Sequence, residues 1–475
     1  MKLRQFKKTF TFFAFLFQLS VFLNSCENEK QIKTHSLEEI KKRGKLVAIT
    51  GYNNYSYFIY KGKTMGFEYE LLKRFADKIG VDVEIKLQKN INEMFSSLEK
   101  NNGDLIAYNL TVTNERKQNY EFTNHLNITN QVLIQRKPKK WRRLSIDRIN
   151  DSLVKTPHEL DNKTVYVRNG SAYFNRLKNL SEESGININI VLANDTLSTE
   201  DLIEQVANGK IDYTIADENV AHLNSEFFTI LDIDTKLSLP QRIAWAVNKN
   251  SIELLDELNK WIDQFKKTMD FQVIYERYYE HKSYYKNRRQ SKYLLQEGGV
   301  ISQFDHIIKK YSKIINWDWR LLASIVYQES KFVNEDTSWA GAVGLMQILP
   351  ETGKAYGVDD LLDPEKNIQV GAKYLKWLDD YWAKKVKNKD ERIKFVLASY
   401  NLGYGHIDDA RKLAKKYGAD SSKWDMNVET YLMKKSSEEY YNDEVVRNGY
   451  CHCKETINFV KEIMQRYARY IQFIH

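Results

Sequence analysis

DWRLLASIVYQES, residues 318–330, is the stretch that decides the fold of the C-terminal part of the chain. Its first residue, Asp318, is a favoured N-cap and predicts the start of a helix. Leu322, Ile325 and Val326 recur at helical spacing, and Glu329 continues the same face. Because an apolar stripe of this kind packs into a core, we expect Glu329 to lie at the end of a buried surface.

A carboxyl group in that position has a specific chemical use. An unpaired carboxyl beside apolar walls has a raised pKa and stays protonated near neutrality. Cleavage of a glycosidic bond needs such a proton donor at the leaving oxygen. Taken alone, a Glu at a helix end is more often solvated or ion-paired, so the sequence around Glu329 has to decide.

Four motifs follow the Glu329-Ser330 pair in order: GAVGLMQILP at 341–350, DPEKNI at 363–368, GAKYL at 371–375 and ASYNLGYG at 398–405. In order and spacing they resemble the lysozyme-like domain of lytic transglycosylases of the soluble-transglycosylase type. The resemblance covers most of residues 300–475. It implies cleavage of the β-1,4 bond between MurNAc and GlcNAc in peptidoglycan glycan strands, with 1,6-anhydromuramoyl ends and no cofactor or metal.

The same resemblance implies residue roles. Glu329 would protonate the leaving oxygen and then act as base on the C6 hydroxyl of the same muramoyl sugar. Five residues would bind the substrate or place the catalytic group: Ser330, Met346, Gln347, Tyr400 and Asn401. For Met346 and Tyr400, ordinary core packing is the alternative interpretation.

The last family motif contains one departure. It spans residues 455–460, and Phe459 stands where a Tyr is usual. A hydrogen bond to the catalytic region is then either lost or supplied by another tyrosine such as Tyr450. This motif leaves a second hypothesis open, in which the protein is a non-catalytic sensor that binds peptidoglycan or muropeptides.

Cys451 and Cys453 precede that motif and are separated by His452. Two cysteines this close do not form an easy mutual disulfide in a helix or a strand. Adjacent ligands of this kind do not complete a closed zinc site either. We therefore expect no metal here.

The N-terminal half has a different pattern. Lys45–Thr50 is typical of a buried strand, residues 66–78 of a helix and residues 81–85 of an alternating strand. The rhythm continues through about residue 216, and strands that alternate with helices predict an α/β sheet with crossover connections. The sequence therefore predicts a multidomain chain in which an α/β domain precedes an α-helical domain.

Several stretches of this half resemble periplasmic amino-acid-binding proteins of solute-binding family 3, among them GFEYEL at 66–71 and TVTNER at 111–116. The resemblance implies two α/β lobes that close on a ligand. Arg116 would bind the ligand α-carboxylate with a bidentate fork, Thr111 and Ser171 would assist, and Asp217 would take the α-amino group. A surface or interlobe salt bridge is the alternative for Arg116.

The two domains together resemble membrane-bound lytic transglycosylases over nearly the whole chain. This resemblance implies that the first domain senses a wall-derived effector, a muropeptide or an amino acid, and regulates the second. The formal charge of +9 is modest for 475 residues, and no helix-turn-helix or zinc-finger pattern is present. We therefore expect no nucleic-acid partner.

The N-terminus carries a targeting signal. Basic residues between Lys2 and Lys8 precede an apolar run, Phe10–Leu23, which is the layout of a signal peptide. The sequence LNSC at 23–26 resembles a lipobox, so cleavage before Cys26 would leave a lipidated N-terminus. Glu27, rather than Asp, favours an outer-membrane lipoprotein that faces the periplasm.

These patterns divide the chain into five expected segments: a signal peptide (1–25), a lipidated tether (26–35), a solute-binding family 3-like domain of two lobes (36–285), a linker (286–299) and a lysozyme-like transglycosylase domain (300–475).

Overall fold

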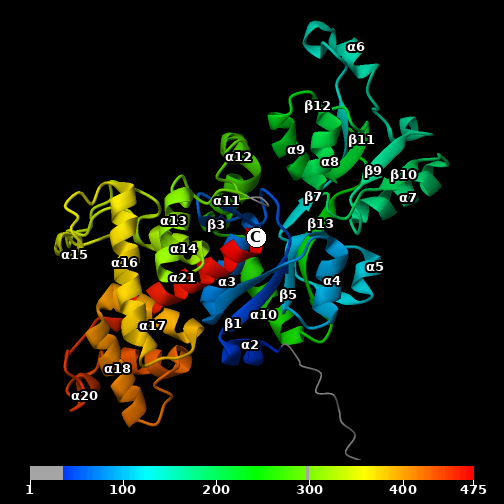
Figure 1. Ribbon diagram of the computed structural model, residues 1–475. Helices are drawn as coiled ribbons and strands as arrows, with labels where there is room; N and C mark the ends of the chain where they lie inside the picture. The colour runs from blue at the N-terminus through cyan, green and yellow to red at the C-terminus, as the bar shows by residue number, and fades with distance from the viewer. Residues whose placement is uncertain (1–35, 296–298, 475) are drawn as a thin grey trace, which may run out of the picture.

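A computed structural model describes residues 36–295 and 299–474 of the chain. The expected signal peptide, the tether and Cys26 lie outside these residues. The described chain forms a two-lobed α/β part followed by a helical part (Figure 1).

The first lobe is built on one mixed sheet in the order β4-β1-β5-β13-β6, with β7 also paired to β13. β1 runs parallel to β4 and β5, whereas β13 runs antiparallel to β5, β6 and β7. Its strands are β1 (Lys45–Thr50), β4 (Asp82–Leu87), β5 (Leu105–Thr111), β6 (Tyr120–Phe122), β7 (Asn127–Thr129) and β13 (Gln241–Asn248). Its helices are α2 (Leu37–Arg43), α3 (Phe67–Ile79), α4 (Ile91–Glu99), α5 (Asn114–Lys117) and α10 (Ile252–Phe265).

The second lobe is built on a five-stranded sheet in the order β10-β9-β11-β8-β12. Its strands are β8 (Gln131–Arg136), β9 (Thr164–Val167), β10 (Asn189–Leu192), β11 (Tyr213–Asp217) and β12 (Leu231–Asp232). Its helices are η1 (Trp141–Arg143), α6 (Ile146–Asn150), η2 (Pro157–Leu160), α7 (Ala172–Ser184), α8 (Thr199–Ala207) and α9 (Glu218–Phe227). The chain enters this lobe between β7 and β8 and returns between β12 and β13, so two connections join the lobes.

The segment after the lobes is more structured than a linker. Residues 251–280 form α10, α11 (Met269–Tyr275) and η3 (Glu276–Glu280). The segment 286–299, expected to be a linker, begins inside α12 (Lys282–Arg289). Tyr285 and Arg288 of this helix are buried, and the Tyr285 hydroxyl donates to Glu200 Oε1 at 2.5 Å. Polar and basic composition suggested a solvated linker, but α12 is held by tertiary contacts with the lobes.

The helical part contains α13 (Asp305–Ile315), α14 (Trp319–Ser330), α15 (Pro350–Ala355), α16 (Pro364–Ala383), α17 (Lys389–Leu402), α18 (Tyr404–Lys416), η4 (Trp424–Val428), α19 (Glu429–Lys434), α20 (Glu438–Tyr441) and α21 (Cys453–Phe473). The predicted start of the α14 helix is confirmed, because the Asp318 side chain accepts from the Arg320 backbone N–H. Leu322, Ile325 and Val326 are fully buried, as the helical spacing predicted.

Two elements join the helical part to the first lobe. Figure 1 shows α21, in red, running from the helical part until the C-terminus lies against the α/β part. Near its end, Gln472 Nε2 donates to the Ile85 carbonyl of β4 at 3.1 Å. The other element is the hairpin of β2 (Phe58–Tyr60) and β3 (Lys63–Met65). Its turn residue Gly62 accepts from the Tyr470 hydroxyl at 2.9 Å, so the hairpin and α21 lock together.

Candidate active site

Glu329 lies one residue before the end of α14 and is half-buried. Within the described chain, no hydrogen bond or ion pair holds its carboxyl group. Burial alone raises the pKa of Glu329 to about 8. The group is therefore mostly protonated at neutral pH and can donate a proton.

Tyr400, at the end of α17, lies near Glu329 and contacts Met346. The Tyr400 hydroxyl donates to the Met346 carbonyl at 2.7 Å. Burial, followed by the nearby Glu329 carboxyl, raises the pKa of Tyr400 well above its usual value. The Met346 side chain is fully buried, which matches the core-packing alternative, and its backbone carbonyl orients Tyr400.

The backbone around the site is tied down by side chains. Ser330 is buried, and its hydroxyl donates to the carbonyls of Leu345 at 2.9 Å and Val326 at 3.2 Å. Ser330 therefore connects the end of α14 to the loop at 341–349. Gln347 has a left-handed backbone (φ 47°), and its amide nitrogen donates to the carbonyls of Asp336 and Gly344.

Asn401 is exposed at the end of α17 and is held by the last helix. The Thr456 hydroxyl of α21 donates to Asn401 Oδ1 at 2.6 Å, and no residue of the described chain accepts from the Asn401 amide nitrogen. Phe459 is buried among apolar side chains. The Tyr450 hydroxyl lies against His452, so Tyr450 does not supply the hydrogen bond that Phe459 lacks.

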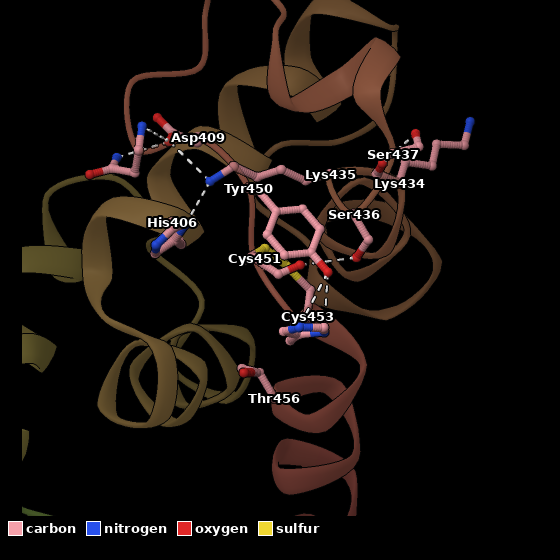
Figure 2. Close-up of a disulfide and its surroundings, with 12 residues drawn as sticks. His406, Asp409, Lys434, Lys435, Ser436, Ser437, Tyr450, Cys451, Cys453 and Thr456 are labelled. Carbon is pink, nitrogen blue, oxygen red and sulfur yellow. Dashed lines mark hydrogen bonds and ion pairs between the residues drawn. A yellow bond between two sulfur atoms is a disulfide. The ribbon is translucent and has the colours of Figure 1, made fainter. Parts of the chain in front are cut away.

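Cys451 and Cys453 form a disulfide, contrary to our expectation (Figure 2). We expected no disulfide because two cysteines this close do not pair easily within a helix or a strand. Cys451 and His452 instead precede α21 in irregular backbone, and the two Cα atoms lie 5.3 Å apart, a usual separation for bonded cysteines. In residues 36–295 and 299–474, no cluster of three or more His, Cys, Asp or Glu is placed to hold a metal ion.

The four residues predicted for the α/β part come together at one cavity between the lobes. Thr111 and Arg116 come from the first lobe, and Ser171 and Asp217 from the second. The cavity holds only about 20 Å³, so the lobes lie close together around it. Arg116 spans them, because its guanidinium donates to the Thr111 carbonyl at 2.7 Å and to the Gly170 carbonyl at 2.8 Å.

Asp217 is the acidic group of this cavity. Burial raises its pKa to about 7, although hydrogen bonds from Asn109 and Tyr173 and the Arg116 charge act in the opposite direction. Asp217 Oδ2 accepts from the Asn109 amide at 2.7 Å. Among the described residues, nothing donates to Asp217 Oδ1.

Two family models match the chain. The Transglycosylase SLT domain matches residues 306–423, and the model of bacterial extracellular solute-binding proteins, family 3, matches residues 45–281. A relative from Desulfosudis oleivorans is 35% identical over 436 residues, which are 91% of this chain and 91% of the relative. A relative from Pseudomonas fluorescens (strain Pf0-1) is 33% identical over 92% of this chain and 86% of its own length. Both are named membrane-bound lytic murein transglycosylase F.

The chain belongs to the membrane-bound lytic murein transglycosylase F family. The predicted fold class, a two-lobed solute-binding domain followed by a helical lysozyme-like domain, is confirmed in this member of the transglycosylase F family. Among solved structures, a mutant arginine-binding protein from T. maritima matches 52% of this chain and 99% of its own, with 24% identity and a TM-score of 0.44. An amino-acid transporter substrate-binding protein from Streptococcus pneumoniae, bound to L-arginine, matches with 23% identity and a TM-score of 0.44.

The sequence motifs did not predict one residue of the interlobe cavity in this transglycosylase F family member, Arg168. Arg168 lies at the same cavity, and its guanidinium donates to the Tyr108 hydroxyl at 2.6 Å. Among the described residues, no acceptor is found for the buried Arg168 Nε. One signal was available, because Arg168 directly follows the stretch that forms β9 and precedes Gly170 and Ser171.

Proposed function

We propose that Glu329 performs both proton transfers in this peptidoglycan lytic transglycosylase. The observation that carries the proposal is the isolated carboxyl at the end of α14, whose pKa burial raises to about 8. The group is protonated at the start of a turnover and needs no partner to remain so. The family and its SLT domain support the same reaction.

This single carboxyl group is sufficient for both proton transfers of one turnover. Glu329 donates its proton to the glycosidic oxygen, and the bond from that oxygen to C1 of the muramoyl residue breaks. The C6 hydroxyl of the same sugar then bonds to C1 and gives its proton to the Glu329 carboxylate. The 1,6-anhydro product forms without water, and Glu329 is again protonated. Two-carboxylate glycosidases use a second acid as the nucleophile or to activate water. Here the nucleophile is the C6 hydroxyl, which belongs to the substrate.

The neighbouring residues have supporting roles in this proposal. Tyr400 and Asn401 are the polar groups placed to meet the sugar, since Tyr400 lies beside Glu329 and the Asn401 amide nitrogen has no acceptor within the described chain. Ser330, Met346 and Gln347 act through the backbone that holds Glu329 and Tyr400. This division follows from their hydrogen bonds: Ser330 and Gln347 donate to backbone carbonyls, and the Met346 carbonyl accepts from the Tyr400 hydroxyl.

The test is a digest of purified sacculi with mass analysis of the sugar ends. The wild type is expected to release 1,6-anhydromuramoyl ends. Glu329→Gln keeps the size and polarity of the side chain and is expected to lose activity by about a thousandfold or more while the protein stays folded. Reducing muramic acid ends would contradict the proposal, and undiminished cleavage by Glu329→Gln would contradict the role of Glu329.

We further propose that the interlobe cavity binds an effector with an α-amino acid end, such as a free amino acid or a muropeptide stem. Arg116 and Arg168 offer cationic groups for a carboxylate, and Asp217 Oδ1 offers an unused acceptor for an ammonium group. Next to this cavity lies a cleft of about 1440 Å³, and Arg168 lines both. The cleft runs along β4 and α21 and has room for the rest of a larger effector. Isothermal titration with free amino acids and purified muropeptides tests the proposal, and binding unaffected by Arg116→Ala would contradict it.

The proposed location is the periplasmic side of the outer membrane, through a lipid on Cys26. The relatives are named membrane-bound, and within residues 36–295 and 299–474 no helix has the length and apolar character needed to cross a membrane. Labelling cells with a radioactive fatty acid tests this proposal. Cys26→Ser is expected to abolish the label, and a labelled Cys26→Ser protein would contradict it.

A further inference from the structure

A stripe of four aromatic side chains leads away from the candidate active site. Tyr374, Trp377 and Tyr381 lie along α16 at positions i, i+3 and i+7, and Tyr404 begins α18. We call these four residues the aromatic stripe. It is continuous with the site beside Glu329, because the Tyr374 ring lies 5.6 Å from the Tyr400 ring, centroid to centroid.

The rings of the stripe support one another. Trp377 stacks on Tyr374 at 6.0 Å with an interplanar angle of 11°, and on Tyr381 at 6.2 Å with an angle of 22°. Tyr404 meets the edges of Trp377 and Tyr381 at 5.4 Å and 5.0 Å. The outer end is anchored by Lys385, whose Nζ donates to the Tyr381 hydroxyl and pairs with Asp408, both at 2.7 Å.

The stripe is nevertheless open to solvent. Trp377 is 44% exposed and Tyr404 is 42% exposed. A packed core does not need these rings at the surface, and an exposed group of adjoining aromatic side chains is typical of a binding surface. Because neighbouring rings already hold each orientation, a ligand that stacks on them loses little side-chain entropy on binding.

The shape and charge of the stripe fit a glycan chain. A helix rises about 1.5 Å per residue, so Tyr374 and Tyr381 are separated by roughly 10 Å along α16, which is comparable to one disaccharide repeat. In β-1,4-linked hexosamines, the ring C–H bonds form an apolar face with slight positive charge. That face complements the negative face of an aromatic ring, and the tyrosine hydroxyls can meet the sugar substituents.

We propose that the aromatic stripe binds the peptidoglycan glycan strand beyond the bond that is cleaved, with Trp377 as its central platform. This inference rests on the proposed function, because it takes the strand at Glu329 to continue past Tyr400. The stripe provides distal subsites that favour long strands over short fragments. It therefore adds affinity for the substrate without taking part in the proton transfers.

The test measures binding without cleavage. Full-length protein carrying Glu329→Gln is titrated with long peptide-free glycan strands and, separately, with a tetrasaccharide of the same repeat. Adding Trp377→Ala is expected to weaken binding of the long strands by about tenfold, and to leave tetrasaccharide binding unchanged. Trp377→Phe is expected to retain most of the affinity. In the active enzyme, Trp377→Ala is expected to raise KM for long strands with kcat unchanged.

Tyr417 provides the matched control. It is also 44% exposed, and it stacks on Tyr431 in the same domain, but its ring cluster does not join Tyr400. Tyr417→Ala is expected to leave affinity for both ligands unchanged. Equal binding of long strands with and without Trp377→Ala, or an equal loss for the tetrasaccharide, would overturn the inference. Tyr404→Ser provides a second variant if Trp377→Ala does not fold. The sacculus digest with Glu329→Gln tests the catalytic role separately, so a failure of the aromatic stripe to bind long strands is distinguishable from a failure of the proposed function.

Discussion

At the scale of single residues, the proposed chemistry depends on one carboxyl group, Glu329, that the fold destabilises in its charged form. Glu329 has no ionic or hydrogen-bonding partner within the described chain, and burial raises its pKa to about 8. A site that holds an acid ready for proton donation reduces the stability of the protein when that acid ionises. The arrangement therefore has a measurable signature in unfolding experiments.

Glu329→Gln is expected to stabilise the protein at alkaline pH. The carboxyl has a higher pKa in the folded than in the unfolded chain, so its contribution to stability is full below about pH 4.5 and is lost as the pH rises through about 8. The variant lacks this loss. Its melting temperature, compared with that of the wild type, is expected to gain several degrees between about pH 5 and pH 9. Calorimetry across this pH range measures the difference in melting temperature between the variant and the wild type. A difference that does not change with pH would contradict the raised pKa.

Asp217 is the second residue whose pKa has a functional consequence. Burial raises its pKa to about 7, and only the ionised form attracts an ammonium group. Affinity for an amino-acid effector is therefore expected to rise by about tenfold per pH unit below pH 7 and to level off above it. Titration calorimetry with the amino acid or muropeptide that binds measures this. Asp217→Asn is expected to bind weakly at every pH, and an unchanged pH dependence in that variant would assign the titration to another group.

At the scale of elements, the candidate active site depends on close packing between α16 and the loop that contains Met346. Gly371 of α16 has no side chain where one would collide with Met346, since a Cβ atom there would lie 2.3 Å from Sδ and 2.6 Å from Cε. Asn367, one turn earlier, accepts from the Met346 backbone N–H at 2.8 Å. α16 therefore fixes the carbonyl group that orients Tyr400.

Gly371→Ala is expected to displace Met346 and cost about 1–3 kcal/mol of stability, together with part of kcat through Tyr400. A double-mutant cycle with Met346→Ala isolates the cause, because removing the Met346 side chain also removes the collision. The double variant is expected to lose less stability than the sum of the two single variants. Additive losses in urea unfolding would show that the two positions are independent.

At the scale of the whole molecule, the first lobe approaches the end of α14 closely. A Cβ atom on Gly62, in the turn between β2 and β3, would lie 2.7 Å from Phe332 and 2.8 Å from Tyr327. Tyr327 and Phe332 flank Glu329 in the sequence, and Phe332 reaches the hairpin because its own backbone is left-handed (φ 63°). We therefore expect a shift of this lobe to move the segment that holds Glu329, and the Gly62 contact is a physical route by which the solute-binding domain could affect catalysis.

Gly62→Ala is expected to loosen this interface and change specific activity, because the added methyl group pushes the hairpin away from α14 and α21. Gly80→Ala is the matched control. Gly62 and Gly80 have nearly equal backbone angles (φ 74° and 76°), but no atom lies within 4 Å of a Cβ on Gly80. Both variants carry a similar backbone strain of about 1 kcal/mol. Only Gly62→Ala is expected to increase proteolytic cleavage between the domains, and equal cleavage in both would contradict the route.

Much of this organisation could be predicted from local patterns in the sequence. The helix Trp319–Ser330 and its buried face follow from residues three and four apart. The alternation of strands and helices follows from residues within each segment. Glu329 as the candidate acid, and Arg116 with Asp217 as the candidate ligand pair, come from the resemblance of motifs of a few residues to known families. These features depend on neighbours in the chain, so the sequence by itself determined them.

Only the tertiary structure decided the features that depend on contacts between distant segments. Burial raises the pKa of Glu329, and its neighbour Tyr400 comes from a helix that lies far from it in the sequence. α12 packs against the lobes instead of serving as a linker, Arg168 joins the interlobe cavity, and Gly62 meets Tyr327 and Tyr470. Local periodicity carries no information about which surfaces meet, because close packing is a property of the assembled fold and not of any one segment.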